Sequence, residues 1–171
     1  MSMKPLAHEY AGYYDQYIDR VGDDANILTV LADQIGTLEA FTSTIDDDKA
    51  RYRYADGKWS IKELFGHLMD SERIFGYRAL CIARGETQPL PGFDEETYVA
   101  NAIFDERKLG DIIAEMTILR KANLLLFASL AEQDVVRQGI ANGKPVTPRA
   151  LMWILAGHTE HHLGVLKERY L

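Results

Sequence analysis

The clearest signal in the sequence is a set of apolar residues that recur every three to four positions. Over residues 25–45 this spacing is that of one face of an α-helix, and the apolar positions are Ile27, Val30, Leu31, Ile35 and Leu38. Asp23 or Asp24 could cap the start of this segment. The pattern predicts a first long helix with one buried face.

Three further long helices are predicted from their end signals. The motif WSIKE at 59–63 has the form of a capping box and opens a helix that runs to about residue 84, where Gly85 ends it. Periodicity predicts a third helix at about 109–131. Thr147 as N-cap and Pro148 at the first helical position predict the start of the last helix.

The connections between these helices complete the predicted fold. Residues 85–107 form a long irregular stretch, and loops of this length in compact domains are often functional. Asn142-Gly143 is a tight-turn signal that favours a small hairpin, and the arm at 1–22 can add a short helix. We therefore predict one all-α domain over 1–171, an antiparallel four-helix bundle with an N-terminal helical segment and a hairpin before the last helix.

Composition narrows the possible partners and compartment. The formal net charge of the 171 residues is −7, which argues against nucleic-acid binding because that function needs a basic surface. Cys81 is the one cysteine, so no intrachain disulfide can form, and a reducing compartment such as the cytoplasm is expected. No apolar stretch resembles a signal peptide or approaches the ~18 residues of a membrane span.

Histidines cluster in the last predicted helix, where positions 158–162 hold three of the five in the chain. On a helical wheel His158 and His162 lie about 40° apart within an apolar stripe, and His161 lies on the flank of that stripe. An i, i+4 pair can place two imidazole nitrogens on one cation. His158 with His161 could also chelate, so spacing alone leaves the pair open.

A third ligand is available on the second predicted helix. His67 lies near the margin of its apolar face, and small Ser71 one turn further on leaves room beside the ring. Three histidines from two helices would leave coordination positions free for water or substrate. The competing interpretation is three core histidines, each satisfied by a hydrogen bond. The sequence HTEHH matches neither H-E-x-x-H nor H-x-x-E-H, which argues against a zincin-type protease.

Two motifs together resemble those of the DinB/YfiT-like superfamily. They are W-S-x-x-E-x-x-x-H-L-x-D-x-E at 59–72 and G-H-x-x-H-H-L at 157–163. The resemblance implies a bundle with a divalent metal, zinc or nickel, held by His67, His158 and His162, often in a homodimer. Relatives include bacillithiol transferases and mycothiol-dependent maleylpyruvate isomerase, in which the metal is thought to activate a low-molecular-weight thiol.

These observations lead to a ranked set of hypotheses. The preferred one is a metal-dependent enzyme, a thiol S-transferase acting on a small electrophile; the alternatives are a metal-dependent hydrolase and a metal- or ligand-binding module without catalysis. Further side chains could assist the metal or contact substrate: Asp70, Glu72, Arg78, Tyr98, Glu160 and His161. The apolar residues Phe65, Met69 and Trp153 point away from the histidine stripe, which favours a dimer surface; packing against the N-terminal arm of the same chain is the competing account.

Overall fold

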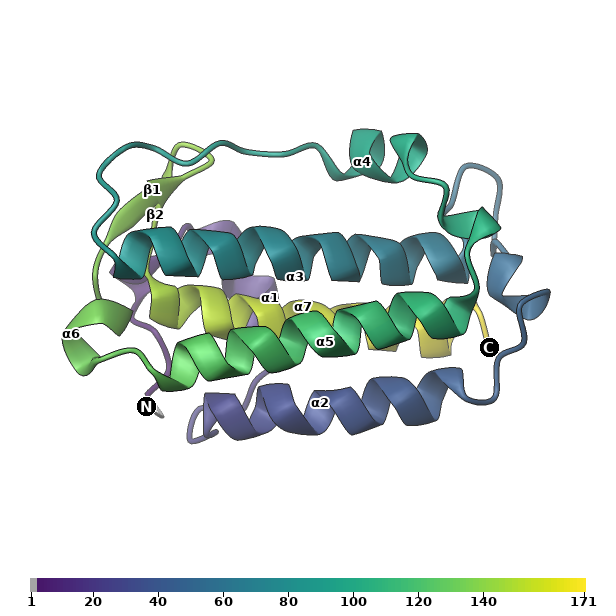
Figure 1. The fold of residues 1–171 in the computed structure, drawn as a ribbon, viewed down its shortest axis with the longest axis horizontal. Coiled ribbons are helices and arrows are strands. Elements are labelled where there is room, and N and C mark those ends of the chain that lie inside the picture. The colour runs from purple at the N-terminus through teal and green to yellow at the C-terminus, as the bar shows by residue number, and fades with distance from the viewer. Residues whose placement is uncertain (1–2) are drawn as a thin grey trace.

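Four long helices form the body of the molecule in a computed structural model, which describes residues 3–171 (Figure 1). They are α2 (Ile27–Thr42), α3 (Ile61–Ala83), α5 (Leu109–Ala128) and α7 (Pro148–Arg169). Helix α3 packs against α5 and α7, and α2 packs against the same two helices. The predicted four-helix bundle is therefore confirmed.

The direction of the helices differs from the all-antiparallel prediction at two packed pairs, α3 with α5 and α2 with α7. Along α2 and α7, Ile27 shares a cavity with Met152 and Trp153, and Gln34 further on binds Ala156 and Glu160, so these two helices run in the same direction. Along α3 and α5, Lys62 binds the carbonyl of Arg107 and Glu72 pairs with Arg120, so residue numbers rise together and the two helices run in the same direction. The cause is the connection at 84–108, which returns along the whole length of α3 before α5 begins (Figure 1). A parallel neighbour requires such a long crossover.

The crossover at 84–108 is more ordered than the sequence predicted. It contains α4 (Glu95–Asn101), whose first turn is capped by the Asp94 carboxylate accepting from the Thr97 amide at 2.8 Å. Its first half is held at Leu90, whose amide donates to Ile140 at 2.8 Å and whose carbonyl accepts from Asn142 at 3.0 Å. The prediction of an irregular stretch was wrong for α4, because a seven-residue helix is too short to give a periodic signal.

The strands that hold Leu90 are the predicted hairpin. Strands β1 (Gly139–Ala141) and β2 (Lys144–Val146) pair antiparallel, with Gly139 opposite Val146. Asn142 and Gly143 have φ values of 51° and 69°, the left-handed backbone that a tight two-residue hairpin turn requires. A short α6 (Glu132–Val135) precedes the hairpin.

The helix ends show which capping signals were correct. Ser60 and Glu63 make the predicted capping box, and the Thr147 hydroxyl accepts from the Ala150 amide at 3.1 Å. Helix α2 is capped by Asn26 and not by Asp23 or Asp24, since the Asn26 side chain accepts from the amides of Leu28 and Thr29. Helix α5 ends at Ala128, three residues before the predicted end.

The N-terminal arm adds the expected short helical segments. They are η1 (Ala7–Glu9), η2 (Gly12–Tyr14) and α1 (Asp15–Ile18), and α1 packs on α7. The arm is fixed by Glu9, which is buried, accepts a 2.8 Å hydrogen bond from the Thr147 hydroxyl and pairs with Arg149. This ion pair joins the arm to the start of α7.

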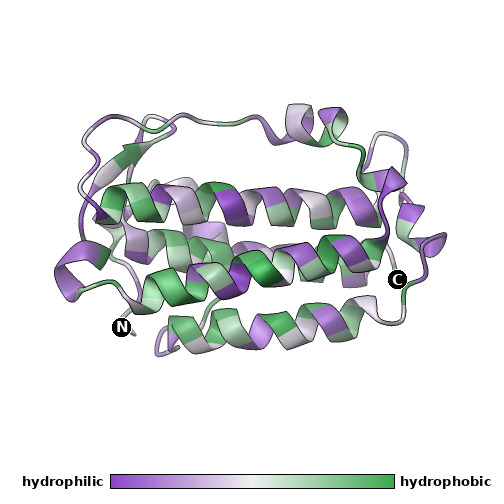
Figure 2. Ribbon diagram, in the orientation of Figure 1, coloured by the Kyte–Doolittle hydropathy of each residue, from purple (hydrophilic) through white to green (hydrophobic). Residues whose placement is uncertain are grey.

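The core fills the space between the helices, and apolar residues recur along each of them (Figure 2). Phe65, Met69 and Trp153 belong to it, each no more than 2 % exposed. The inference of a dimer surface from these three residues is therefore wrong, because the arm, the crossover and α5 cover them within one chain. In the described chain no helix combines the length and the apolar character that crossing a bilayer requires.

The close approach of α1 to α7 depends on Gly157. A Cβ built at this position would lie 1.9 Å from the backbone oxygen of Tyr17, whereas one at Gly164 would meet nothing within 4 Å. We expect Gly157→Ala to lower the free energy of unfolding by about 1–3 kcal/mol, because backbone must move. Gly164→Ala, the matched control, should raise it by up to about 1 kcal/mol. Urea unfolding of both variants measures this, and equal effects would contradict the packing argument.

Candidate metal centre

Three histidine rings meet between α3 and α7. Helix α3 supplies His67, and α7 supplies His158 and His162 one turn apart. The Nε2 atom of His158 lies 3.1 Å from that of His67 and 3.0 Å from that of His162. The structure therefore brings together the three residues that the sequence singled out, with one nitrogen of each pointing at the others.

The packing of α3 against α7 explains why these rings converge. The stripe of α7 that carries His158 and His162 is buried against α3, where His67 is 7 % and His158 is 6 % exposed. The indole ring of Trp59 packs on His67 at 4.9 Å between centroids, and the Tyr17 ring packs edge-on against His158 at 5.1 Å. These contacts fix the orientation of the imidazoles.

Burial keeps the three imidazoles neutral near pH 7. Loss of solvation lowers the pKa of His67 to about 4 and that of His162 to about 2. The pKa of His158 is also lowered well below its usual value, by burial first and then by the other two histidines. A neutral imidazole has a lone pair on one ring nitrogen, which is the form that ligates a metal.

The arrangement fits a divalent cation. An imidazole nitrogen offers either one N–H or one lone pair, so Nε2 of His158 cannot make a good hydrogen bond to both neighbours at once. A cation among the three nitrogens would use all three lone pairs together. Among residues 3–171 this cluster holds histidines alone, without a carboxylate, so the ligands would not neutralise the charge of the ion.

A cavity of about 220 Å³ opens onto the three rings. Its walls come from the N-terminal arm, α3, the crossover and the hairpin turn. The lining residues besides the histidines are Tyr13, Tyr14, Tyr17, Trp59, Ser71, Phe75, Arg78, Phe93, Glu95, Glu96 and Asn142. A ligand in this cavity would therefore contact the open side of the histidine cluster and a largely aromatic wall.

Arg78 is the one further candidate that lines this cavity. Asp70 lies outside it, 3.7 Å from Arg73, and burial raises the pKa of its carboxyl group. Tyr98 is 47 % exposed and packs beside Phe93. These two side chains are not placed to touch a ligand of the histidine cluster.

The remaining candidates have structural partners. Glu72 is fully buried and forms a 2.9 Å ion pair with Arg120 of α5. The Glu160 carboxylate accepts a 2.8 Å hydrogen bond from Gln34. His161 is half-buried with its ring 5.0 Å from that of His162, on the flank of the stripe where the helical wheel placed it.

The aromatic wall is what sequence reasoning missed. Tyr13, Tyr14 and Tyr17 recur at helical spacing, a pattern that by itself favours packing over a ligand site. They come from an arm at the opposite end of the chain from α7, and only the folded arm brings them to the cavity. Trp59 lies just before the capping box and belongs to the motif at 59–72, but nothing in the sequence places its side chain at the site.

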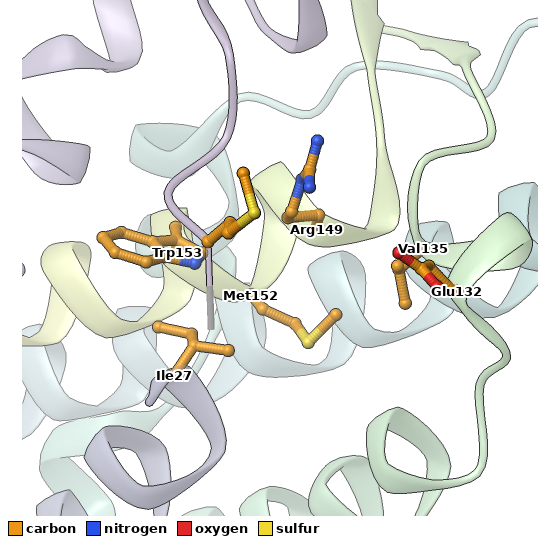
Figure 3. Close-up of a pocket in the computed structure, with 7 residues that line it drawn as sticks. Ile27, Glu132, Val135, Arg149, Met152 and Trp153 are labelled. Carbon is orange, nitrogen blue, oxygen red and sulfur yellow. The ribbon is translucent and has the colours of Figure 1, made fainter. Parts of the chain in front are cut away.

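A second, larger cavity of about 340 Å³ lies elsewhere on α7 (Figure 3). Ile27 of α2, Val135 of α6, and Met152 and Trp153 of α7 surround it, and Arg149 and Glu132 add charge. Figure 3 shows these side chains around the cavity between α2, α6 and α7. It is lined by none of the three clustered histidines, so the smaller cavity is the better candidate for chemistry.

Comparison with known proteins identifies the family of the chain. Residues 31–166 match the family model of the DinB superfamily, a range that includes all of α3 and α7 as far as Leu166. The protein therefore belongs to the DinB superfamily.

Two relatives carry names that mention a metal. A protein of Oceanobacillus iheyensis, named "putative metal-dependent hydrolase", is 23 % identical over 165 residues, which is 94 % of this chain and 83 % of that protein. YfiT from Bacillus subtilis, described as "a probable metal-dependent hydrolase with an unusual four-helix bundle topology", superposes with a TM-score of 0.75 at 19 % identity. That match covers 98 % of this chain and 91 % of YfiT. The match to YfiT supports the four-helix fold of this chain.

Proposed function

We propose that this protein is a metal-dependent enzyme in which His67, His158 and His162 hold a divalent ion, zinc or nickel. The observation that carries the proposal is the convergence of three Nε2 atoms within 4.8 Å of one another at the wall of a cavity. Such an ion keeps its +2 charge with neutral ligands and lowers the pKa of a thiol or water that reaches it. Imidazole ligands suit either metal.

A thiol is the nucleophile that the surroundings of the cluster favour. Within residues 3–171 no carboxylate is a member of the histidine cluster, and of the two acids on the cavity wall, Glu95 and Glu96, Glu96 already accepts a hydrogen bond from the Trp59 indole. A thiol with a pKa near ~8.5 needs far less help to ionise than water, whose pKa is ~15.7. The preferred reaction is therefore an S-transfer. The thiol proton passes to solvent, the sulfur forms a bond to an electrophilic carbon, and the leaving group departs from that carbon.

The side chains around the cavity would orient the reactants for this reaction. The three histidines fix the reacting end of the cavity, and their rings are held by Trp59 and Tyr17. The aromatic residues of the arm and of the crossover line the rest of the cavity and would reduce the access of water to the thiolate. Exclusion of water strengthens each electrostatic contact that the substrate makes there.

A hydrolase is the second candidate, and the names of the two relatives favour it. In that case water would take the place of the thiol, and an ester or amide would be the electrophile. The cavity can admit either nucleophile, so the two candidate enzymes differ only in the nucleophile and the electrophile that they use. A binding module without turnover is the remaining alternative.

The test uses tag-free protein loaded with zinc or nickel and a metal-stripped control. Conjugation of bacillithiol, mycothiol and glutathione to a panel of electrophiles is followed by mass spectrometry, and ester hydrolysis is followed without thiol. We expect metal-dependent conjugation with at least one thiol. Thiol-independent ester hydrolysis would replace the transferase by the hydrolase. No turnover in either assay would contradict both enzymes and leave a binding protein.

A further inference from the structure

Arg78 is a buried arginine without an acidic partner. It lies on α3, is 3 % exposed, and donates one hydrogen bond, 2.7 Å long, to the carbonyl of Pro91. Its guanidinium also lies 5.6 Å from the Phe75 ring and 5.7 Å from the Phe93 ring. Within residues 3–171 it forms no ion pair with a carboxylate, so none of its five N–H donors has a charged acceptor.

Arg120, a second buried arginine, differs from Arg78 because its charge is paired. Arg120 is 1 % exposed, pairs with Glu72 at 2.9 Å, and binds Leu31, Gln34 and Thr159 with its other donors. A buried charge without a partner is costly. Burial without a counter-charge also lowers the pKa of the Arg78 guanidinium. The difference between the two arginines indicates that the partner of Arg78 is not part of the folded chain.

Arg78 lies where a ligand of the histidine cavity could reach it. Arg78 lines the same cavity as the three histidines and lies on the same face of α3 as His67, about 16 Å further along the helix axis. The two acids of this cavity, Glu95 and Glu96, belong to α4, and Glu96 accepts from the Trp59 indole at 3.0 Å. Neither of them pairs with Arg78.

We propose that Arg78 binds an oxyanion at the far end of the substrate, whose reactive end lies at the histidine cluster. The substrate would be a small organic acid, with a carboxylate or a phosphate group that the planar guanidinium can bind through two parallel hydrogen bonds. The cavity of about 220 Å³ is smaller than the roughly 300–1,000 Å³ of drug-sized pockets, which agrees with a small ligand. This inference rests on the proposed function, because it places both ends of the substrate in one cavity.

A structural role for Arg78 is the competing explanation. Its hydrogen bond to Pro91 joins the crossover to α3, and a loss of this bond could disturb the cavity without any role in binding. Glutamine at this position can still donate to the Pro91 carbonyl but carries no charge. The variant Arg78→Gln therefore removes the charge and keeps a donor for the Pro91 carbonyl. The variant Arg78→Lys keeps the charge without the planar guanidinium.

The experiment measures binding of matched probes by isothermal titration calorimetry. Hexanoate, hexyl phosphate and hexan-1-ol are titrated into metal-stripped protein, and 6-mercaptohexanoate and 6-mercaptohexan-1-ol into both metal-stripped and zinc-loaded protein. Wild type should bind at least one anionic probe about tenfold more tightly than the matched alcohol, because a hydrogen bond to a charged group is worth that much. Arg78→Gln should remove this preference, and Arg78→Lys should keep part of it. Arg84→Gln, at the exposed end of the same helix, is the matched control and should leave it unchanged.

The outcomes separate this inference from the proposed function. Equal affinity for acid and alcohol in wild type overturns the role of Arg78, even where both thiols bind better with zinc. A preference for the anion that persists in Arg78→Gln overturns it as well. A preference present in metal-stripped protein, with no gain from zinc for either thiol, would support Arg78 and contradict the metal-activated thiol. The wild-type comparison does not depend on the folding of any variant.

Discussion

Replacing His158 by alanine is expected to remove metal from the protein while the helical bundle stays folded. His158 is the central member of the cluster, because its Nε2 atom is in contact with those of both His67 and His162. Removing a residue that only hydrogen-bonds to a metal ligand weakens metal binding roughly 10–100-fold. Removing the central ligand itself should therefore weaken metal binding at least about 100-fold. Any metal-dependent turnover should fall with it.

The measurement is metal content per chain by inductively coupled plasma mass spectrometry on tag-free protein, with circular dichroism to check folding. Wild type should carry about one ion per chain and His158→Ala well under one tenth of that. His161→Ala is the matched control, because His161 is the next histidine on α7 but lies on the flank of the stripe, outside the cluster. Equal metal content in all three proteins would show that the cluster is not a metal site.

Removing the Glu72 carboxylate is expected to cause the largest loss of stability. Glu72 and Arg120 are 0 % and 1 % exposed, and they join α3 to α5 at the centre of the bundle. Glu72→Ala would leave the guanidinium of Arg120 buried without its counter-charge. Breaking a buried pair in this way costs about 3–5 kcal/mol. Chemical denaturation followed by circular dichroism gives this free energy of unfolding directly.

Two controls decide whether the unpaired charge is the cause. The double variant Glu72→Met with Arg120→Met removes both charges and should recover most of the lost stability, since apolar replacements of buried pairs are often neutral. Arg137→Ala breaks an exposed pair with Asp134 and should change stability by less than about 1 kcal/mol. A double variant as unstable as Glu72→Ala would mean that packing and not charge sets the loss.

Much of the fold was predictable because its signals are local. The capping box at Ser60 and the N-cap at Thr147 are formed by residues within one turn of each other, so they could be identified without a structure. The hairpin turn at Asn142 and Gly143 is equally local. The seven-residue helix α4 was missed because its cap at Asp94 is not followed by enough turns to show a period.

The candidate site was predictable only in part, and for a related reason. Two of its histidines are one helical turn apart, so the sequence shows that they share a face. Predicting His67 as the third member also required the assumption that α3 packs on that face. Its convergence with the pair to within 4.8 Å is a property of the packed helices. The tyrosines of the arm gave no sign of their position beside the cluster, because nothing near them in sequence specifies α7 as their neighbour.

By itself the sequence determined the long helices, the caps of α3 and α7, and which histidines share the inner face of the last helix, because these follow from patterns of one or two turns. The tertiary structure decided that α3 and α5 run in the same direction, that Trp153 and Phe65 face the interior, and that Glu72 pairs with Arg120 whereas Arg78 pairs with no acid among residues 3–171. Those properties depend on contacts between residues tens of positions apart. Such contacts form only when apolar faces are buried together, and no local pattern records which pairs will meet.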